Sequence, residues 1–305
     1  MSPLKIGVAL GSGAGRGWAH IGALRALERA GLTPQVVAGT SVGALVGGLY
    51  AAGMLDRLEK WARDLNTFRI FRLLDLRPLS GGFVGGEKLL GAIRENLGTT
   101  TIEALPRSFV AVSTDLVTGH EVWLREGMVV DALHAAFALP GIFAPVNRGG
   151  RWLVDGALVN PVPVSVCRAL GCQLVVAINL NGDVLGKKRD AADALAPAGY
   201  DMFEHIVPAA GLAAAGAIPP ESAPPKRAGP SAPNVLSVMV ASLNIIQDRL
   251  SRSRLAGDPP DVLIAPRIGH IGLLEFDRAG EAIEEGAAAV ERALPTIRDA
   301  VLALS

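Results

Sequence analysis

The sequence predicts an α/β fold in which helices pack on a mainly parallel β-sheet. Short runs of apolar and β-branched residues alternate along the chain with longer amphipathic segments, as in a sheet covered by helices. Several of these runs are apolar at every position, which is typical of strands that are buried on both faces. Hydrophobic residues make up 50% of the 305 residues and charged residues 19%, so the chain can bury a large core.

Seven short segments rich in branched aliphatic residues are predicted to form the strands. In chain order they are Lys5–Leu10, Gln35–Ala38, Phe109–Thr114, His120–Leu124, Arg151–Val154, Gln173–Asn179 and Asp261–Ala265. Eight other segments are amphipathic with the helical period or are largely apolar, and they are predicted to be helices that pack on the sheet. These are Trp18–Ala30, Ser41–Gly53, Leu55–Leu65, Glu87–Leu97, Val129–Leu139, Val164–Leu170, Val235–Leu255 and Arg278–Leu304.

The composition of the chain changes at two points, and these divide it into three parts. Residues 5–180 are predicted to form the core of the domain. Residues 181–233 are rich in alanine and proline and contain the tract PPESAPPKRAGPSAP, which has no apolar period, so a flexible insertion is expected there. Residues 234–305 then supply a helix, a strand and a final helix, which are expected to pack on the same domain.

Charge and cysteine content exclude several classes of protein. Lys+Arg and Asp+Glu number 29 each, so no net field draws the chain onto nucleic acid or an acidic bilayer. The apolar run Ile6–Leu10 is too short for a signal peptide, and no stretch is long enough to span a bilayer. We therefore expect a cytoplasmic protein whose membrane contacts, if any, are peripheral. Cys167 and Cys172 fit neither a zinc site nor a disulfide framework and are expected to be reduced core thiols.

The pentapeptide Gly39-Thr40-Ser41-Val42-Gly43 follows a predicted strand and precedes a predicted helix. A serine on such a tight turn exposes its hydroxyl, and glycines at 39 and 43 let backbone and substrate approach closely. The helix N-terminus would also favour negative charge on an attacked carbonyl oxygen. Ser41 is therefore a candidate nucleophile; the alternative is that it only caps the helix.

A serine nucleophile of an α/β-hydrolase usually works with an acid and a histidine further along the chain. The histidines of this sequence are His20, His120, His134, His205 and His270. Only the last three lie well downstream, and none of them follows a strand among small neighbours; His270 is the least unsuitable. The pattern therefore favours a dyad of two residues over a triad.

A glycine-rich loop follows the first predicted strand and leads into a helix. It lacks the third glycine and the later acidic residue of a dinucleotide-binding fingerprint, and also the Gly-Lys-Ser/Thr of a P-loop. Its converging N–H groups suit an oxyanion hole. Arg16 either anchors the loop or adds positive charge near the oxyanion, and we favour the anchor. The candidate loop residues are Ser12, Gly13, Ala14, Gly15, Arg16 and Gly17.

Asp155 follows a short predicted strand and precedes Gly156, so its carboxylate can reach into a cleft. An aspartate before a glycine is also common in ordinary β-turns, and this alternative stays open. Because a carboxylate is a weak base, Asp155 can take the Ser41 proton only within hydrogen-bond reach, while the oxyanion is stabilised. In the predicted cycle it passes that proton to the leaving alcohol and later activates water, without a metal or a cofactor.

Three segments, GSGAGRGWAHIG, GTSVG and DGALVNP, occur in this order, and from about Lys5 to Pro163 the chain resembles the patatin-like phospholipase family, most closely its bacterial branch. The resemblance implies a three-layer α/β/α sandwich. It also implies hydrolysis of lipid acyl esters by a Ser–Asp dyad with a glycine-rich oxyanion hole. Ser41 matches the nucleophile of the family, and Asp155, Gly156 and Ala157 match its DG[AG] motif.

The glycine-rich loop matches the family's GGGxRG-like stretch with two departures. Ser12 and Ala14 stand where the commoner pattern has glycine. Both residues are small, so donation from the backbone is expected to survive. His20 matches a position of the family's HxG that we interpret as supporting the loop and not as catalytic.

The substrate is expected to be a lipid or another acyl ester. The apolar segments Leu73–Phe83 and Phe137–Val146 are candidate borders of an acyl pocket, with core packing as the alternative. The insertion and the segment NVLSVMVASLNIIQDRL are candidates for docking on a membrane or a partner. Two other functions suit the same residues: an acyltransferase or an esterase for small soluble esters with the same dyad, and a catalytically silent regulatory protein.

Overall fold

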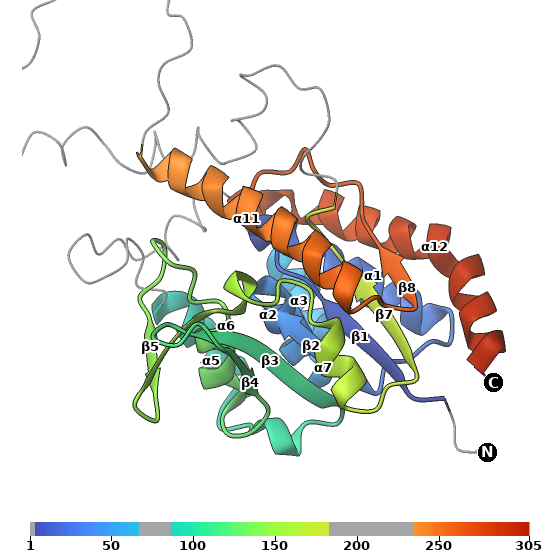
Figure 1. The fold of residues 1–305 in the computed structure, drawn as a ribbon, viewed down its shortest axis with the longest axis horizontal. Coiled ribbons are helices and arrows are strands. Elements are labelled where there is room, and N and C mark those ends of the chain that lie inside the picture. The colour runs from blue at the N-terminus through green and yellow to red at the C-terminus, as the bar shows by residue number, and fades with distance from the viewer. Residues whose placement is uncertain (1–3, 67–86, 183–234, 305) are drawn as a thin grey trace, which may run out of the picture.

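One mixed sheet runs through the computed structural model, which describes residues 4–66, 87–182 and 235–304 (Figure 1). In space the described strands follow the order β5-β6-β3-β2-β1-β7-β8, and β4 also pairs with β3. Strands β1, β2, β3, β7 and β8 are parallel, whereas β4, β5 and β6 run antiparallel to their neighbours. The strands are β1 (Ile6–Leu10), β2 (Val36–Thr40), β3 (Ser108–Asp115), β4 (Glu121–Leu124), β5 (Val146–Arg148), β6 (Arg151–Asp155), β7 (Leu174–Ile178) and β8 (Val262–Ile264).

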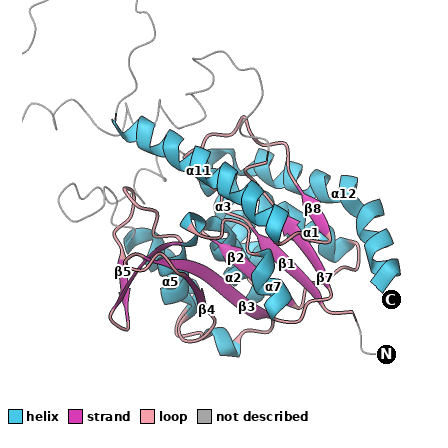
Figure 2. Cartoon of the chain, viewed as in Figure 1, coloured by secondary structure: helices cyan, strands magenta, loops and turns pink. Residues whose placement is uncertain are grey.

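Helices cover both faces of this sheet, so the predicted three-layer α/β/α architecture is confirmed (Figure 2). The α-helices are α1 (Ala19–Arg29), α2 (Val42–Ala51), α3 (Leu55–Arg63), α5 (Glu87–Leu97), α6 (Val129–Ala136), α7 (Val164–Ala169), α11 (Val235–Gly257) and α12 (Ala279–Leu304). Short 3-10 turns are η1 (Ala14–Trp18), η2 (Ile102–Ala104), η3 (Gly156–Leu158) and η5 (Phe276–Arg278).

Alternate residues of the central strands belong to two separate apolar layers. In β1, Val8 and Leu10 pack with helices α1, α2, α6 and α12, whereas Ala9 packs with α7 on the opposite face. Both cysteines, Cys167 and Cys172, are buried in the α7 layer as free thiols, as expected. The strands must therefore be apolar on both faces, which explains why they are such clear signals in the sequence.

The predicted elements differ from the structure at a few boundaries. β5 (Val146–Arg148) was not predicted, because a three-residue edge strand that is half polar has no apolar run to mark it. α2 begins at Val42 and not at Ser41. α6 ends at Ala136, three residues early, because the Ala138 carbonyl leaves the helical path to accept a hydrogen bond from Asp155 N. The candidate pocket segment Leu73–Phe83 lies outside the described residues, as do residues 183–234.

Helices α1 and α12 cross at Gly22 of α1 and Gly286 of α12, and each glycine lies against the backbone of the other helix. A Cβ atom on Gly22 would lie 1.8 Å from the Ile283 carbonyl oxygen, and one on Gly286 would lie 1.9 Å from the Ala19 carbonyl oxygen. No side chain fits at either position unless the helices move apart. The last helix of the chain therefore packs directly on the first.

We expect Gly22→Ala and Gly286→Ala each to lower the free energy of unfolding by about 1–3 kcal/mol, because overpacking forces the two helices apart. Gly91→Ala in α5 is the matched control, since a Cβ there meets nothing within 4 Å. It should raise stability by up to about 1 kcal/mol through helix propensity. Urea unfolding of the three variants measures this, and a Gly22→Ala protein as stable as Gly91→Ala would contradict the close crossing.

Candidate active site

Strand β3 brings the ends of two other strands together. Ala111 and Val112 pair with β2 on one edge and with β4 on the other, whereas Ser113 and Thr114 pair with β4 and β6. Because each residue of a strand has only two edges, β2 and β6 must share one edge of β3. β2 runs parallel to β3 and β6 antiparallel, so their carboxyl ends meet there. Thr40 is paired with Val112, and Asp155 with the next residue, Ser113.

Ser41 lies in the tight turn between β2 and α2, with φ 57° and ψ −126°. Its side chain does not cap α2; instead Oγ donates a hydrogen bond of 2.5 Å to Oδ2 of Asp155. The turn requires glycine on both sides, because a Cβ on Gly39 would lie 2.4 Å from the Gly43 carbonyl oxygen and one on Gly43 would lie 2.2 Å from that of Leu10. The strained backbone thus directs the hydroxyl at the carboxyl group.

Asp155 ends β6 in a fully buried position. Its Oδ1 accepts a hydrogen bond of 2.8 Å from Ala157 N. The aspartate therefore also shapes the local turn, which was the alternative to a catalytic role in the sequence analysis. Burial raises the pKa of this carboxyl to about 7, and the hydrogen bonds from Ser41 and Ala157 offset part of the rise. Near neutral pH the group can therefore both take up and release a proton.

The glycine-rich loop, residues 12–17, offers fewer free N–H groups than its sequence suggests. Ser12 N donates to the Pro161 carbonyl, Gly15 N to that of Leu273, and Arg16 N to that of Gly13. Within the part of the chain that the structure describes, the N–H groups of Gly13 and Ala14 have no acceptor. Ala14 has a left-handed φ of 45° and lines the same cavity as Ser41.

Side chains from distant parts of the chain hold this loop in place. The guanidinium group of Arg16 is fully buried and donates to the Ile271 carbonyl and to the side chains of Asn181 and Asn244. Ser12 Oγ donates to Gln247 Oε1 of α11 over 3.0 Å. These hydrogen bonds tie Arg16 to segments that support the loop, as an anchor requires.

His20 lies under the same loop and is fully buried. Burial lowers its pKa to about 4, and the hydrogen bond to Gly11 opposes this shift. The ring is therefore neutral at pH 7, and Nε2 donates to the Gly11 carbonyl oxygen over 2.7 Å. This contact is the kind of loop support that the sequence led us to expect.

No described histidine bonds to Ser41 or Asp155. His270, the least unsuitable triad candidate, is exposed and pairs with Glu281 of α12. His205 lies outside the described residues. Among residues 4–66, 87–182 and 235–304, no group of three or more His, Cys, Asp or Glu side chains is placed to hold a metal ion.

An apolar cavity of about 120 Å³ opens beside Ser41. From the predicted border segment Phe137–Val146 it receives Phe137, Leu139, Ile142 and Phe143. Ala14 of the glycine-rich loop and Val42 of the pentapeptide also line it. The rest of the wall was not singled out in the sequence, because its residues come from separate segments and resemble ordinary core or loop residues there. They are Trp18, Leu45, Trp61, Leu65, Leu89, Leu274 and Phe276.

The chain matches a family model and several known proteins. The family model described as patatin-like phospholipase matches residues 8–168. A Mycobacterium tuberculosis protein, described as an uncharacterized NTE family protein, is 34% identical over 95% of this chain and 91% of its own length. Lysophospholipase NTE1 of Saccharomyces cerevisiae is 31% identical over 59% of this chain and 11% of its own length. The solved structure of VipD from Legionella pneumophila aligns over 97% of this chain and 79% of its own, with a TM-score of 0.40 and 12% identity.

We expect Asp155→Asn to raise the free energy of unfolding, by about 1–3 kcal/mol at pH 8 and by less at pH 5. The folded-state pKa of about 7 lies above the ordinary 3.8. The folded protein therefore favours the protonated carboxyl, and wild type loses stability as pH rises from about 4 through 7. An asparagine side chain is neutral throughout this range.

Urea unfolding at the two pH values measures the effect. Asp258→Asn, at an exposed position after α11, is the control and should leave the pH dependence of stability as in wild type. A stability gain of equal size at pH 5 and pH 8, or a loss at pH 8, would show that ionisation of the buried Asp155 carboxyl does not destabilise the folded protein.

Proposed function

This chain belongs to the patatin-like phospholipase family and is a lipid ester hydrolase, and from that premise we propose that Ser41 and Asp155 form its catalytic dyad. The observation that carries the proposal is the hydrogen bond of 2.5 Å between Ser41 Oγ and the buried carboxyl of Asp155. Both residues lie within the matched segment, and Ser41 lines the apolar cavity. A nucleophile, a base in contact with it and an apolar pocket are what acyl transfer from a lipid requires.

The reaction proceeds in two halves. In the first, Ser41 Oγ attacks the ester carbonyl carbon while its proton moves to Asp155 Oδ2, and the carbonyl oxygen becomes an oxyanion. The intermediate collapses, the bond to the alcohol breaks, and the alcohol leaves with the proton from Asp155. In the second half water attacks the acyl-enzyme with Asp155 as base, and the fatty acid is released.

We assign oxyanion stabilisation to the N–H groups of Gly13 and Ala14, together with the first N–H groups of α2. The loop donors have no other acceptor among the described residues, and Val42 at the start of α2 lines the cavity beside Ser41. Each such donor contributes roughly 3 kcal/mol to stabilisation of the transition state. Ser12, Gly15 and Arg16 then serve to hold the loop, because their N–H groups are already bonded elsewhere.

The raised pKa of Asp155 supports its role as base. A carboxylate with an ordinary pKa near 3.8 would accept a hydroxyl proton very reluctantly, whereas a group with a pKa of about 7 is a stronger base that is still partly ionised at neutral pH. The burial that causes this shift also keeps the Asp155 carboxyl group out of contact with bulk water.

We also propose that the enzyme meets its substrate at a lipid surface through α11. No helix of the described residues is long and apolar enough to cross a bilayer. α11, however, exposes about half of the surface of Val238, Ile245 and Ile246, and it contacts the glycine-rich loop through Asn244. Exposed branched aliphatic residues beside the site suit peripheral contact with lipid. The expected cytoplasmic location stays a prediction.

We expect Ser41→Ala and Asp155→Asn each to lower kcat/KM for a p-nitrophenyl ester by about 10³-fold or more, and Ser41→Ala to abolish labelling by a fluorophosphonate probe. In wild type, kcat/KM should fall as pH drops below about 7, because a protonated Asp155 cannot accept the serine proton. Ser253→Ala, at an exposed position of α11, is the control for labelling. Undiminished labelling of folded Ser41→Ala protein would refute the assignment.

Replacement of both Ile245 and Ile246 by glutamate should reduce co-flotation with phosphatidylcholine vesicles several-fold, since charge at these positions opposes burial in lipid. Hydrolysis of a soluble four-carbon ester by the same protein shows whether the site is intact. Leu302→Glu, at an exposed position of α12, is the matched control and should float as wild type does. Equal flotation of all three proteins would exclude α11 as the contact surface.

A further inference from the structure

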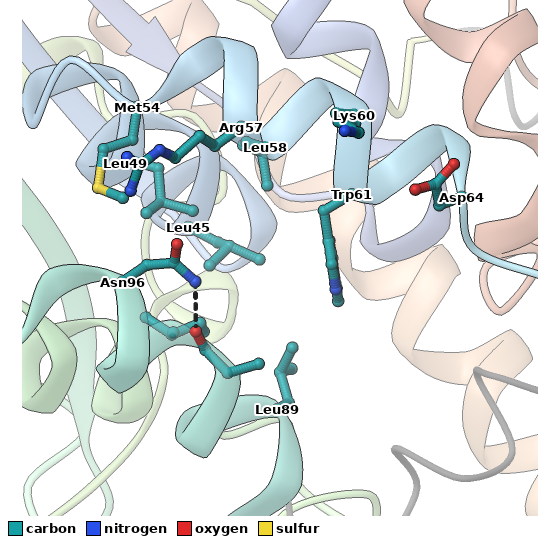
Figure 3. Close-up of a pocket in the computed structure, with 12 residues that line it drawn as sticks. Leu45, Leu49, Met54, Arg57, Leu58, Lys60, Trp61, Asp64, Leu89 and Asn96 are labelled. Carbon is teal, nitrogen blue, oxygen red and sulfur yellow. Dashed lines mark hydrogen bonds between the residues drawn. The ribbon is translucent and has the colours of Figure 1, made fainter.

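A second apolar cavity of about 350 Å³ lies between α2, α3 and α5 (Figure 3). Leu45, Leu49, Leu58 and Ile93 form its buried wall. Arg57, Lys60, Asp64 and Asn96 lie at its solvent-exposed rim. Its volume is in the range of small-molecule sites, about 300–1,000 Å³, and the mechanism described above does not use it.

The two cavities are neighbours that share part of one wall. Leu45, Trp61 and Leu89 line both the cavity beside Ser41 and the second cavity. The Trp61 ring meets the Trp18 ring edge to face at 5.8 Å, which holds it at this boundary. In Figure 3, Trp61 and Leu89 lie at one end of the second cavity and Met54 and Asn96 at the other. The end with Trp61 is therefore the end next to the serine.

The cavity beside Ser41 is too small for a long acyl chain. Its volume of about 120 Å³ is below that of an engineered protein cavity of about 150 Å³ that binds benzene, a six-carbon molecule. A lipid acyl chain that continues beyond roughly six carbons must leave this cavity or remain in water. The second cavity begins where the first ends, and its inner surface is apolar.

We propose that the second cavity binds the distal part of a long acyl chain whose carbonyl group lies at Ser41. The chain passes between Leu45 and Leu89 beside Trp61 and runs along α5 toward Asn96. This inference rests on the proposed function and adds the acyl-length preference of the site. Leu45, Trp61 and Leu89 then form the boundary between the two cavities. An acyl chain crosses this boundary only when it is too long for the first cavity.

The apolar interior favours this occupant over a polar head group. An acyl chain needs no hydrogen-bond partners and gains free energy from each methylene that it removes from water. The charged groups Arg57, Lys60 and Asp64 lie at the exposed rim and stay hydrated when a chain fills the interior. A free fatty acid bound with its carboxylate at Arg57 is the competing occupant, and inhibition by such an acid distinguishes it from an acyl chain.

Ala92 of α5 gives the sharpest test, because it lines the second cavity but not the first. For p-nitrophenyl esters of four to sixteen carbons, wild-type kcat/KM should rise beyond six carbons. Ala92→Phe should lower the ratio of kcat/KM for the sixteen-carbon ester to that for the four-carbon ester by about tenfold or more. Each methylene kept out of the cavity costs about fourfold in binding. Ala92→Leu, a smaller obstruction, should give an intermediate ratio.

Glu95→Phe places the same ring at an exposed position of the same helix and should leave the ratio unchanged. An active enzyme whose ratio is unmoved by Ala92→Phe would overturn this inference and leave the proposed function intact. If the ratio were unmoved while Arg57→Gln weakened inhibition by hexadecanoate, the cavity would bind a free fatty acid instead. A wild-type enzyme that hydrolyses neither ester would overturn the proposed function itself.

Discussion

The sharing of one edge of β3 by two strands of opposite direction is the constraint on which the site depends. β2 and β6 end against consecutive residues, Val112 and Ser113. Ser41 and Asp155, which are 114 positions apart in the chain, are thereby brought into hydrogen-bond contact by the register of the sheet. The side chain of Thr40 reinforces this arrangement, because its hydroxyl donates to the Asn160 carbonyl in the segment after Asp155. A shift of one residue in either pairing would separate the two groups.

The site contains features that cost stability and that the surrounding core must offset. Ser41 and Ala14 are the non-glycine residues with left-handed φ among the described residues, and each such strain costs about 1–3 kcal/mol. Asp155 is a fully buried carboxyl group with a raised pKa. All three border the place where an ester carbonyl is proposed to bind. Strain and burial therefore hold the groups in position before substrate arrives, so that little reorganisation is needed during the reaction.

The C-terminal part of the chain supports the glycine-rich loop at several points. The family model matches residues 8–168, yet Arg16 binds Ile271 and Asn244, and Gly15 N donates to Leu273. Trp18, directly after the loop, donates its indole N–H to the Phe276 carbonyl. Helix α12 packs against α1, which follows this loop. The geometry of the proposed oxyanion hole thus depends on residues that carry none of the family's motifs.

The sequence alone determined the fold class and the positions of most elements, because these depend on local signals, and it predicted that Ser41 and Asp155 act together. Buried parallel strands are apolar on both faces, and the turn at Ser41 requires glycines at fixed positions beside it. The short strand β5 carried no such signal. Only the tertiary structure decided which loop N–H groups are free, because Ser12 and Gly15 donate to residues far away in the chain. It also decided that two cavities meet at Leu45, Trp61 and Leu89. A shared wall is a property of packing between helices, and no single segment encodes it.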